Sequence, residues 1–596
     1  GTHNRNGEGS VTLGNGATYF GASVATAVGP APLVDSVNAG LAGADPNQVE
    51  LCYPGTLDPA VVSGTIVICK RGVIARVDKS RAVLEAGGVG MVMYNSPDSS
   101  LNADFHFVPS VHVTNANGLA IKAYAATAGP TASIAQASVL YNVPAPFTAS
   151  FSSRGPLLAG GGDLLKPDVI APGQDILAAV APPGNAGRDF DLYSGTSMSS
   201  PHVAGFAALL KSKYPSWSPM MIKSALMTTA NDVLDGPNTN PLVIFRQGAG
   251  HVRPNSAGDP GLVFDSRFND WLNFICGTQP GSFCSAFTPI DPSNLNMASI
   301  AIGDLAGSQT VARTATNVGG KETYAFSYTG LAGFTVTPSA SSFTVNPGAS
   351  QSFAVTFTRT TAPLNSYTGG QITWTGDKGH VVRMPVVLRP VALAAPAQVS
   401  GSYSVTFGYT GPFSAAARGL VPANVTPGTV AQDPDQTFSA ADPTGTVAIP
   451  VTIPAGTTYT RFSLFDADVT PGTDLDLYVY QGSSLVGSSG GGTSAEEVNF
   501  TFASPTASPI ALTVYVHGWG VAGGGSSPFA LHAWYLGSTA AGNMTVTAPA
   551  TATLGASGAI DLTFSGLASG TKYLGSVVYS GAAGMPNPTI VRVDAP

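Results

Sequence analysis

The sequence contains little charge and no long apolar run. Asp, Glu, Lys and Arg make up 10% of its 596 residues, against about a quarter in an average globular protein, and the net charge is −8. This composition excludes a charge-rich coiled coil, and it provides no basic surface for nucleic acid or an anionic membrane. The apolar stretches all fall short of the roughly 18 residues of a membrane helix. We therefore expect neither a membrane span nor a nucleic-acid partner.

Cysteine is also scarce. The four cysteines allow three pairings, and their short separations favour Cys52 with Cys69 and Cys276 with Cys284. Four free thiols in a cytosolic protein are the alternative. No spacing of Cys and His fits a zinc site, and we expect no cofactor.

Glycine and proline, in contrast, are abundant. The sequence has 71 Gly and 46 Pro among many short apolar stretches, which is typical of β-rich extracellular proteins, because their turns need these residues. We predict a secreted protein of about four domains, at roughly 150 residues per domain. The sequence starts at Gly1 without a signal peptide, so we expect an upstream segment to have been removed or left out.

The first part of the sequence combines strand and helix patterns. Residues 1–28 predict short strands at the edge of a larger domain. Residues 64–70 and 90–94 predict buried strands on either side of a helix at 79–87. Strand, helix and strand at this spacing imply a parallel pair with a crossover.

Two further helices are predicted after residue 200. Residues 201–214 carry apolar side chains at helical spacing with almost no charge before Lys211, so we expect a buried helix. The second helix begins at Ser218–Pro219, an N-cap residue followed by Pro in the first helical position. We expect these two helices to cover a sheet.

From about residue 296 the pattern changes to alternating strands. The block up to about residue 391 has the size of one β-sandwich, and residues 392–397 predict a linker. A second β-rich block follows. The final segment, residues 544–593, either belongs to that block or forms a small module of its own.

The strongest chemical signal is the string Gly-Thr-Ser-Met-Ser-Ser-Pro-His-Val-Ala-Gly at residues 195–205. The Ser197 hydroxyl, at a glycine-containing turn before a helix, is exposed to a substrate. The Ser197 N–H lies at the positive end of the helix, where it can stabilise a tetrahedral oxyanion. Acyl-transfer catalysis requires both features. The alternative is a serine that only caps the helix.

This string resembles the nucleophile motif of the subtilisin-like serine proteases, the subtilases. Residues 151–156 and 166–173 resemble further segments of the family in the same order, particularly of its plant-type and large secreted bacterial branch. The rival G-x-S-x-G motif of α/β-hydrolases fails, because Ser199 stands where that motif needs Gly. Many subtilases carry Ala at the position of Ser199. The motif residues that support Ser197 are Gly195, Thr196, Met198, Pro201 and His202.

The resemblance implies a fold class and a domain order. The catalytic domain is α/β, a partial subtilisin-like doubly wound parallel sheet. It is interrupted by an α/β protease-associated domain and followed by all-β sandwich domains. That insertion carries no catalytic group and allows a dimer. The expected domains are the start of the partial catalytic domain at 1–30, the protease-associated insertion at 31–140, the C-terminal part of the catalytic domain at 141–290, a fibronectin-III-like β-sandwich at 291–391, a β-sandwich similar to pre-peptidase C-terminal domains at 398–540, and a C-terminal β segment at 541–596.

The resemblance also implies the activity of a secreted serine endopeptidase that forms an acyl-enzyme on Ser197 with protein or peptide substrates. In the subtilase order, the catalytic Asp, the catalytic His and the oxyanion Asn precede the insertion. We expect them upstream of this sequence, so the missing N-terminal part of the catalytic domain is a partner, and this segment alone is inactive or nearly so. The alternative is a non-catalytic extracellular binding protein with a degenerate protease fold.

Three other groups have simpler interpretations. His202 lies five residues after Ser197 and is a packed helical histidine rather than the base, because a base must reach Ser197 Oγ. Asp168 is a turn or helix-cap acid. Asp474 and Asp476 alternate along one strand and share a face, where a structural calcium is conceivable. A solvated strand face is favoured because no loop ligands are evident, so we assign no metal site.

Overall fold

The computed structural model describes residues 1–3, 6–140, 145–279 and 281–596. These residues form two compact units. The first holds residues 1–303, 310–362 and 366–389, and the second holds residues 304–309, 363–365 and 390–596. No described helix has the length and apolar character that crossing a membrane requires.

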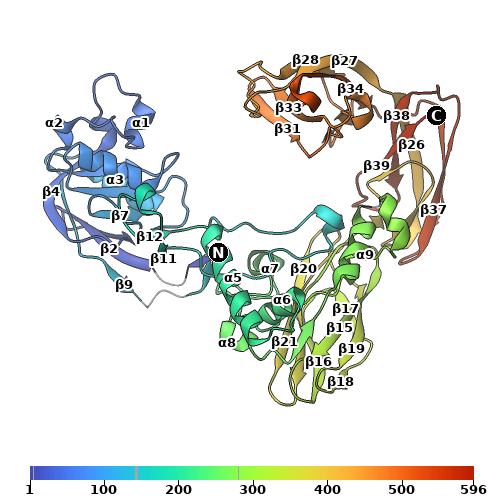
Figure 1. The fold of residues 1–596 in the computed structure, drawn as a ribbon, viewed down its shortest axis with the longest axis horizontal. Helices are drawn as coiled ribbons and strands as arrows, with labels where there is room; N and C mark the ends of the chain where they lie inside the picture. Colours follow the sequence, from blue (N-terminus) through green and yellow to red (C-terminus); the bar gives the residue numbers. More distant parts are fainter. Residues whose placement is uncertain (4–5, 141–144, 280) are drawn as a thin grey trace. The chain divides into compact units, whose positions relative to one another are not determined.

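A mixed sheet with helices around it makes up the inserted domain, residues 6–140 (blue in Figure 1). Its strand order is β3-β7-β6-β5-β4-β8-β2-β9. Strands β5 and β6 are parallel and α3 connects them, which confirms the predicted crossover. The strands are β2 (Asn6–Leu13), β3 (Thr18–Ala22), β4 (Val28–Asp35), β5 (Ile66–Lys70), β6 (Gly90–Tyr94), β7 (Ser110–Val113), β8 (Thr131–Ile134) and β9 (Ser138–Leu140). The helices are α1 (Pro46–Glu50), α2 (Pro59–Val62), α3 (Arg76–Glu85) and α4 (Asn115–Ala125).

Strands β2 and β3 belong to the inserted domain, whereas residues 1–30 were expected to begin the catalytic domain. They form an antiparallel hairpin, and β2 pairs with β8 within the sheet of the inserted domain. Val11 and Leu13 are two residues apart in β2, so they point to the same face of the sheet. Both are buried in the same core as Ile66 and Ile134. The apolar face of β2 therefore assigns this hairpin to the inserted domain.

The following segment, residues 145–279, holds the helices of the expected catalytic domain (Figure 1). Its helices are α5 (Thr196–Lys213), α6 (Pro219–Thr228), α7 (Pro241–Gln247), α8 (Pro254–Ala257) and α9 (Phe268–Thr278). Its strands are β10 (Phe147–Thr148), which pairs with β1 (Thr2–His3), the hairpin of β11 (Ile176–Ala179) and β12 (Phe190–Tyr193), and β13 (Leu262–Phe264). Ser218 caps α6 as predicted, with Ser218 Oγ accepting a hydrogen bond from the N–H of Met221 at 3.0 Å.

The expectation that α5 is buried was wrong. Leu210 packs with Ile222 and Leu226 of α6 in one apolar cluster, but Leu209 is 66% exposed. One side of α5 packs on α6. The two helices do contact a sheet, because Val263 of β13 packs in the same apolar cluster and β13 belongs to the sheet β13-β15-β19-β17. The described residues of this segment and β1 form no doubly wound parallel sheet, and their parallel contacts are isolated bridges, Thr2 with Pro172 and Ile170 with His251.

A β-sandwich follows and completes the first unit (Figure 1). One sheet has the order β13-β15-β19-β17 and the other β14-β21-β20-β16-β18, so β13 extends the sandwich from the helical segment. Trp374 is fully buried and contacts the rings of Phe343 and Phe353. The remaining strands are β14 (Ile300–Leu305), β15 (Ser308–Asn317), β16 (Glu322–Gly330), β17 (Phe334–Pro338), β18 (Ser342–Val345), β19 (Ser350–Arg359), β20 (Thr368–Gly376) and β21 (Val381–Pro390).

The second unit contains two β-sandwiches, one inserted into the other. The inserted sandwich pairs β27-β34-β29-β32 with β28-β33-β30-β31. Its strands are β27 (Asn424–Ala431), β28 (Thr446–Ile453), β29 (Tyr459–Ser463), β30 (Asp474–Gln481), β31 (Ser484–Ser489), β32 (Glu497–Thr501), β33 (Ile510–Gly520) and β34 (Ser526–Leu536). The host sandwich has sheets β22-β24-β37-β35 and β23-β39-β38-β26, with a short β25-β36 pair. Its strands are β22 (Leu393–Ala394), β23 (Gln398–Val399), β24 (Tyr403–Phe407), β25 (Gly411–Pro412), β26 (Ser414–Pro422), β35 (Met544–Thr547), β36 (Thr551–Ala552), β37 (Ser557–Phe564), β38 (Lys572–Ser580) and β39 (Thr589–Asp594).

This arrangement corrects two expectations. Residues 541–596 are not a separate module but belong with the second β-rich block, because β38 pairs along its length with β26. They complete the host sandwich rather than the inserted one, so residues 398–540 are not one sandwich by themselves. Residues 392–397 are not a free linker either, since β22 pairs with β24 and Leu393 is buried in the core of the host sandwich. Pairing between segments so distant in the sequence leaves no local signal.

Candidate active site

Ser197 lies in the first turn of α5, two residues after a glycine cap. Helix α5 begins at Thr196, and Gly195 is its N-cap in an extended conformation, with φ 166° and ψ 166°. The side chain of Ser197 is exposed. A backbone hydrogen bond fixes the turn to the preceding chain, because the N–H of Gly195 donates to the carbonyl oxygen of Gly173 at 2.8 Å. Ser197 is thus presented on a fixed backbone turn.

The helix end around Ser197 provides unpaired donors rather than a side-chain cap. Gly195 is the N-cap of α5, and no side chain of the described residues caps this helix, so the alternative in which Ser197 merely caps it is not observed. The first N–H groups of a helix have no partner within the helix and form its positive end. The Ser197 N–H belongs to this group. An oxyanion formed beside Ser197 Oγ would meet a donor already in position.

The described histidines near this turn make other contacts. The ring of His202 bonds through Nδ1 to the carbonyl oxygen of Met198 at 2.7 Å, which turns it along its own helix. His3 stacks on Phe147 at 5.7 Å, and burial lowers its pKa although the charge of Asp235 opposes this. Burial also lowers the pKa of His251, whose backbone forms bridges to Ile170 and Asn231. None of these contacts provides a base for Ser197.

Asp168 has a structural role outside the candidate site. Its carboxylate forms ion pairs with Lys166 at 2.7 Å and with Lys223 of α6 at 2.9 Å. Its carbonyl oxygen accepts a hydrogen bond from the N–H of Ala249. The residue ties the segment before Gly173 to α6 and to the chain after α7.

Both cysteine pairs are disulfide-bonded. Cys52–Cys69 joins the chain after α1 to β5 in the inserted domain, and Cys276–Cys284 closes a loop from α9. These are the pairs that the sequence favours. Neither disulfide involves a residue of α5 or of the turn before it.

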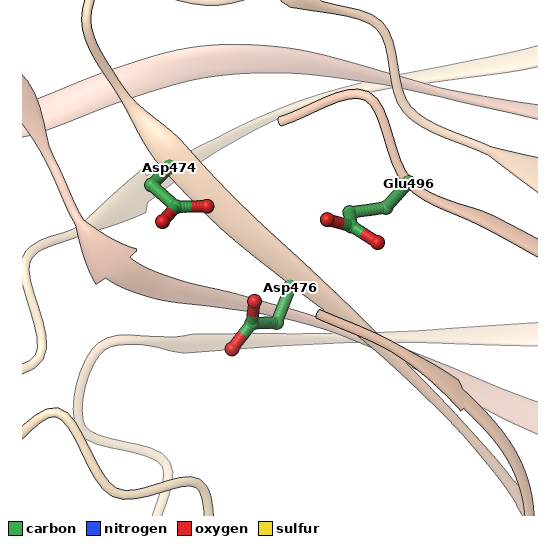
Figure 2. A group of neighbouring side chains, drawn as sticks. All are labelled: Asp474, Asp476 and Glu496. Atoms are coloured by element: carbon green, nitrogen blue, oxygen red, sulfur yellow. The ribbon is translucent and has the colours of Figure 1, made fainter. Parts of the chain in front are cut away.

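Three carboxylates in the inserted sandwich lie close enough to share one cation. Asp474, Asp476 and Glu496 have oxygen atoms within 4.8 Å of one another (Figure 2). Asp476 is only 6% exposed, so the expectation of a solvated strand face was wrong. Burial raises the pKa of Asp474, and the charges of Asp476 and Glu496 add to this. Glu496 was not predicted, since it precedes β32 and only the fold brings it to β30.

Sequence reasoning also missed the residues that support the Ser197 turn from outside its motif. Ser194 directly precedes the cap Gly195, and Asp175 follows Gly173 by two residues. Both are joined to Asn102 of the inserted domain. Asp175 has φ 53°, a conformation uncommon for a residue other than glycine. Side-chain spacing in the sequence gives no indication of these contacts.

Comparison with known proteins adds three family matches. Residues 77–250 match the Subtilase family, residues 30–121 the PA domain, and residues 294–388 the Fibronectin type-III domain. The chain is similar to "Subtilisin-like protease SBT5.3" of Arabidopsis thaliana, with 38% identity over 64% of this chain and 54% of the relative. It is similar to "Subtilisin-like protease SBT1.7" of the same plant, with 39% identity over 63% of this chain and 54% of the relative. A third relative, "Subtilisin-like protease Glyma18g48580" of Glycine max, is 36% identical over 60% of this chain and 51% of the relative. The chain thus spans about half the length of the relatives it matches.

Proposed function

Since the chain is a subtilase with a PA domain and a fibronectin type-III-like domain, we propose that it supplies the nucleophile, Ser197, of a secreted serine endopeptidase. The observation that carries this proposal is the position of Ser197. It is exposed in the first turn of α5, directly after an N-cap glycine that leaves this helix end without a side-chain cap. The relatives are named proteases, which favours this function over a binding protein with a degenerate protease fold.

In the proposed reaction, Ser197 Oγ attacks the carbonyl carbon of the scissile peptide bond and gives its proton to a histidine. The tetrahedral oxyanion accepts a hydrogen bond from the Ser197 N–H. The C–N bond then breaks, the amine leaves with the proton from the histidine, and an acyl-enzyme remains. Water hydrolyses this ester by the same route. The histidine, the aspartate that orients it and an asparagine as the second oxyanion donor would come from a segment outside this sequence.

Secretion is part of the proposal and has its own support. Two disulfides persist in an oxidising compartment and are rare in the cytosol. The low charge and the β-sandwich domains agree with this environment. The proposed substrates are proteins or peptides.

The test is covalent labelling of the full-length protein with a fluorophosphonate probe, in which the serine oxygen displaces fluoride from phosphorus. We expect label on Ser197 and loss of label in Ser197→Ala. Ser200→Ala is the matched control, because Ser200 is exposed one turn further along the same helix. A folded protein that takes up no label on Ser197 would favour the binding-protein alternative.

A further inference from the structure

A loop of the inserted domain, residues 101–104, contacts the residue directly ahead of the Ser197 turn. The side-chain amide of Asn102 donates a hydrogen bond from Nδ2 to Ser194 Oγ at 2.9 Å. Asn102 is 2% exposed, so water competes little for this bond. We propose that Asn102 is a positioning residue that acts through Ser194 to hold the Gly195–Ser197 turn in the orientation needed for attack. This inference rests on the proposed function, in which Ser197 is the nucleophile.

The hydroxyl of Ser194 is fully used in this contact. It donates to Asp175 Oδ1 at 3.1 Å and accepts from the N–H of Asp175 at 2.8 Å and from Asn102 Nδ2. A hydroxyl has one donor and two acceptor positions, so none remains free to form a different bond. The orientation of Ser194 is therefore set by Asp175 and Asn102 together.

Asp175 is itself held by the same loop of the inserted domain. Its Oδ1 accepts a further hydrogen bond from the N–H of Ala103 at 3.2 Å, and the neighbouring Gln174 donates from Nε2 to the carbonyl oxygen of Leu101 at 2.6 Å. A left-handed backbone at an aspartate persists only where its surroundings fix it. The contacts with residues 101–103 provide such surroundings.

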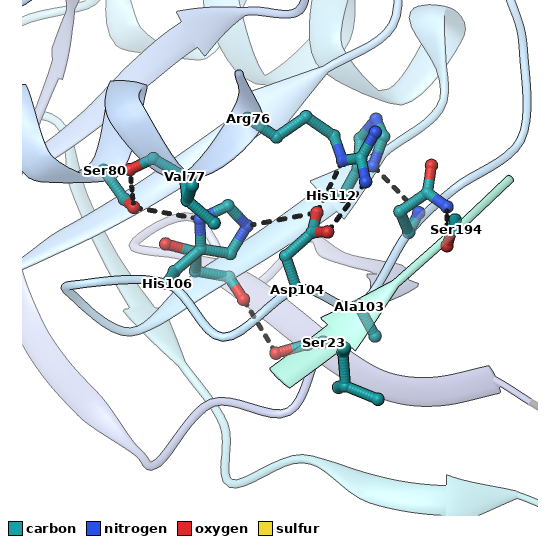
Figure 3. A network of polar contacts seen from close by, with 12 residues as sticks. Ser23, Arg76, Val77, Ser80, Ala103, Asp104, His106, His112 and Ser194 are labelled. Carbon is teal, nitrogen blue, oxygen red and sulfur yellow. Dashed lines mark hydrogen bonds and ion pairs between the residues drawn. The ribbon is translucent and has the colours of Figure 1, made fainter. Parts of the chain in front are cut away.

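Asn102 is anchored on the opposite side by a buried histidine. The N–H of Asn102 donates to His112 Nδ1 at 3.0 Å, and His112 Nε2 bonds to Asn95 Oδ1 at 2.8 Å. Burial lowers the pKa of His112 to about 3, so the ring is neutral at physiological pH and its Nδ1 can accept. Arg76 and Asp104 form a two-bond ion pair in the same network, at 2.5 and 2.7 Å (Figure 3). The loop that carries Asn102 is thus held by buried hydrogen bonds and an ion pair.

The path from Ser194 to the nucleophile is short. Ser194 is followed by Gly195, whose N–H is bonded to Gly173, and then by Thr196 and Ser197. A displacement of Ser194 must therefore move the start of α5 or break the bond to Gly173. A nucleophile misplaced by about 1 Å can react about a hundredfold more slowly, while substrate binding elsewhere is unaffected. The expected signature is a slower chemical step at unchanged affinity.

The test uses the full-length protein and two readouts. The first is the fluorophosphonate reaction of Ser197, separated into its maximal rate and the probe concentration that gives half of it. The second is hydrogen–deuterium exchange of the peptide spanning residues 194–199, which requires no activity. The variants are Asn102→Ala, Ser194→Ala and Ser194→Thr, which keeps the hydroxyl. Ser100→Ala is the matched control, because Ser100 also bonds across to the helical segment, at Ser150, but away from the turn.

For Asn102→Ala and Ser194→Ala we expect the maximal labelling rate to fall at least about tenfold at an unchanged half-saturating concentration, and exchange of residues 194–199 to accelerate. Ser194→Thr and Ser100→Ala should resemble the wild type. If Asn102→Ala fails to fold, Ser194→Ala tests the same bond with the inserted domain intact. The inference would be overturned if hydrogen–deuterium exchange of residues 194–199 in Ser194→Ala were no faster than in Ser100→Ala. If the wild type is never labelled but exchange responds as expected, the proposed function fails, and only the structural part of the inference stands, namely that Asn102 and Ser194 hold the turn.

Discussion

Ser199 Oγ lies directly against Gly173, the residue that holds the start of α5. A Cβ atom on Gly173 would lie 2.1 Å from Ser199 Oγ and 2.9 Å from the carbonyl oxygen of Gly195. Both distances are far shorter than a van der Waals contact. The first turn of α5 can approach the preceding chain this closely only because residue 173 has no side chain.

The substitution Gly173→Ala tests this close approach. We expect it to lower the free energy of unfolding by about 2–3 kcal/mol, since the helix end or the chain beneath it must shift. Gly184→Ala is the control, because no atom lies within 4 Å of a Cβ built there. Urea unfolding of the two variants measures the difference. Equal urea midpoints for the two variants would show that the turn accommodates the added methyl group without loss of stability.

Ser199→Ala should have the opposite effect. Within the part of the chain that the structure describes, Ser199 Oγ is buried and has no hydrogen-bond partner. Removing an unsatisfied buried hydroxyl recovers its desolvation cost, so we expect the free energy of unfolding to rise by about 1 kcal/mol. Ser200→Ala, at an exposed position, should change it by less than about 0.5 kcal/mol. Destabilisation by Ser199→Ala would indicate a partner for this hydroxyl.

The contacts of His380 predict that the free energy of unfolding of the first unit depends on pH. Its Nδ1 lies 2.5 Å from Glu322 Oε2 and its Nε2 lies 3.1 Å from Asp259 Oδ1. Burial disfavours the charged ring, but hydrogen bonds to the two carboxylates outweigh this and raise the pKa of His380. Because the folded pKa exceeds the unfolded value of about 6.5, the stabilisation is complete below that pH and is lost as the pH rises through the folded pKa.

The measurement is urea unfolding of the wild type and His380→Gln between pH 6 and pH 9. We expect the stability advantage of the wild type to shrink by up to about 1 kcal/mol over this range, after allowing for solvent screening of a partly exposed ring. An advantage that does not change with pH would mean that the ring does not gain a proton on folding.

Asp474→Asn should stabilise the second unit at neutral pH. The pKa of Asp474 is raised by burial and by Asp476 and Glu496, so its ionised form carries a penalty above the folded pKa. That penalty disappears as the pH falls towards the unfolded value near 3.9. We expect a gain of up to about 1 kcal/mol at pH 7, discounted for solvent screening, and none near pH 3.5. Thermal unfolding measures it, with the exposed Asp561→Asn as control. A lower midpoint at pH 7 would refute the repulsion.

Local patterns predicted the elements that local forces determine. The parallel pair β5–β6 with α3 between them follows from two apolar runs and a helical pattern, and the N-cap of α6 follows from Ser218–Pro219. The Ser197 turn was identified from a string of adjacent residues. In each case, the residues that form the element also carry its signal.

The remaining features depend on contacts between distant segments. The exposure of Leu209 depends on which strands pack on α5, and the pairing of β26 with β38 depends on closure across the inserted sandwich. The bond between Asn102 and Ser194 joins residues 92 positions apart. Sequence periodicity reports only local structure, so contacts that depend on the tertiary fold could not be predicted from the sequence.

The topology of the second unit sets the order in which its two sandwiches can fold during synthesis. Strands β24 and β26 emerge early, but their partners β37 and β38 are translated only after the whole inserted sandwich. The inserted sandwich is contiguous and can close as soon as β34 has emerged, whereas the host keeps open strand edges until β37 and β38 have emerged. A nascent chain stopped at residue 540 would therefore hold one finished sandwich and half of another.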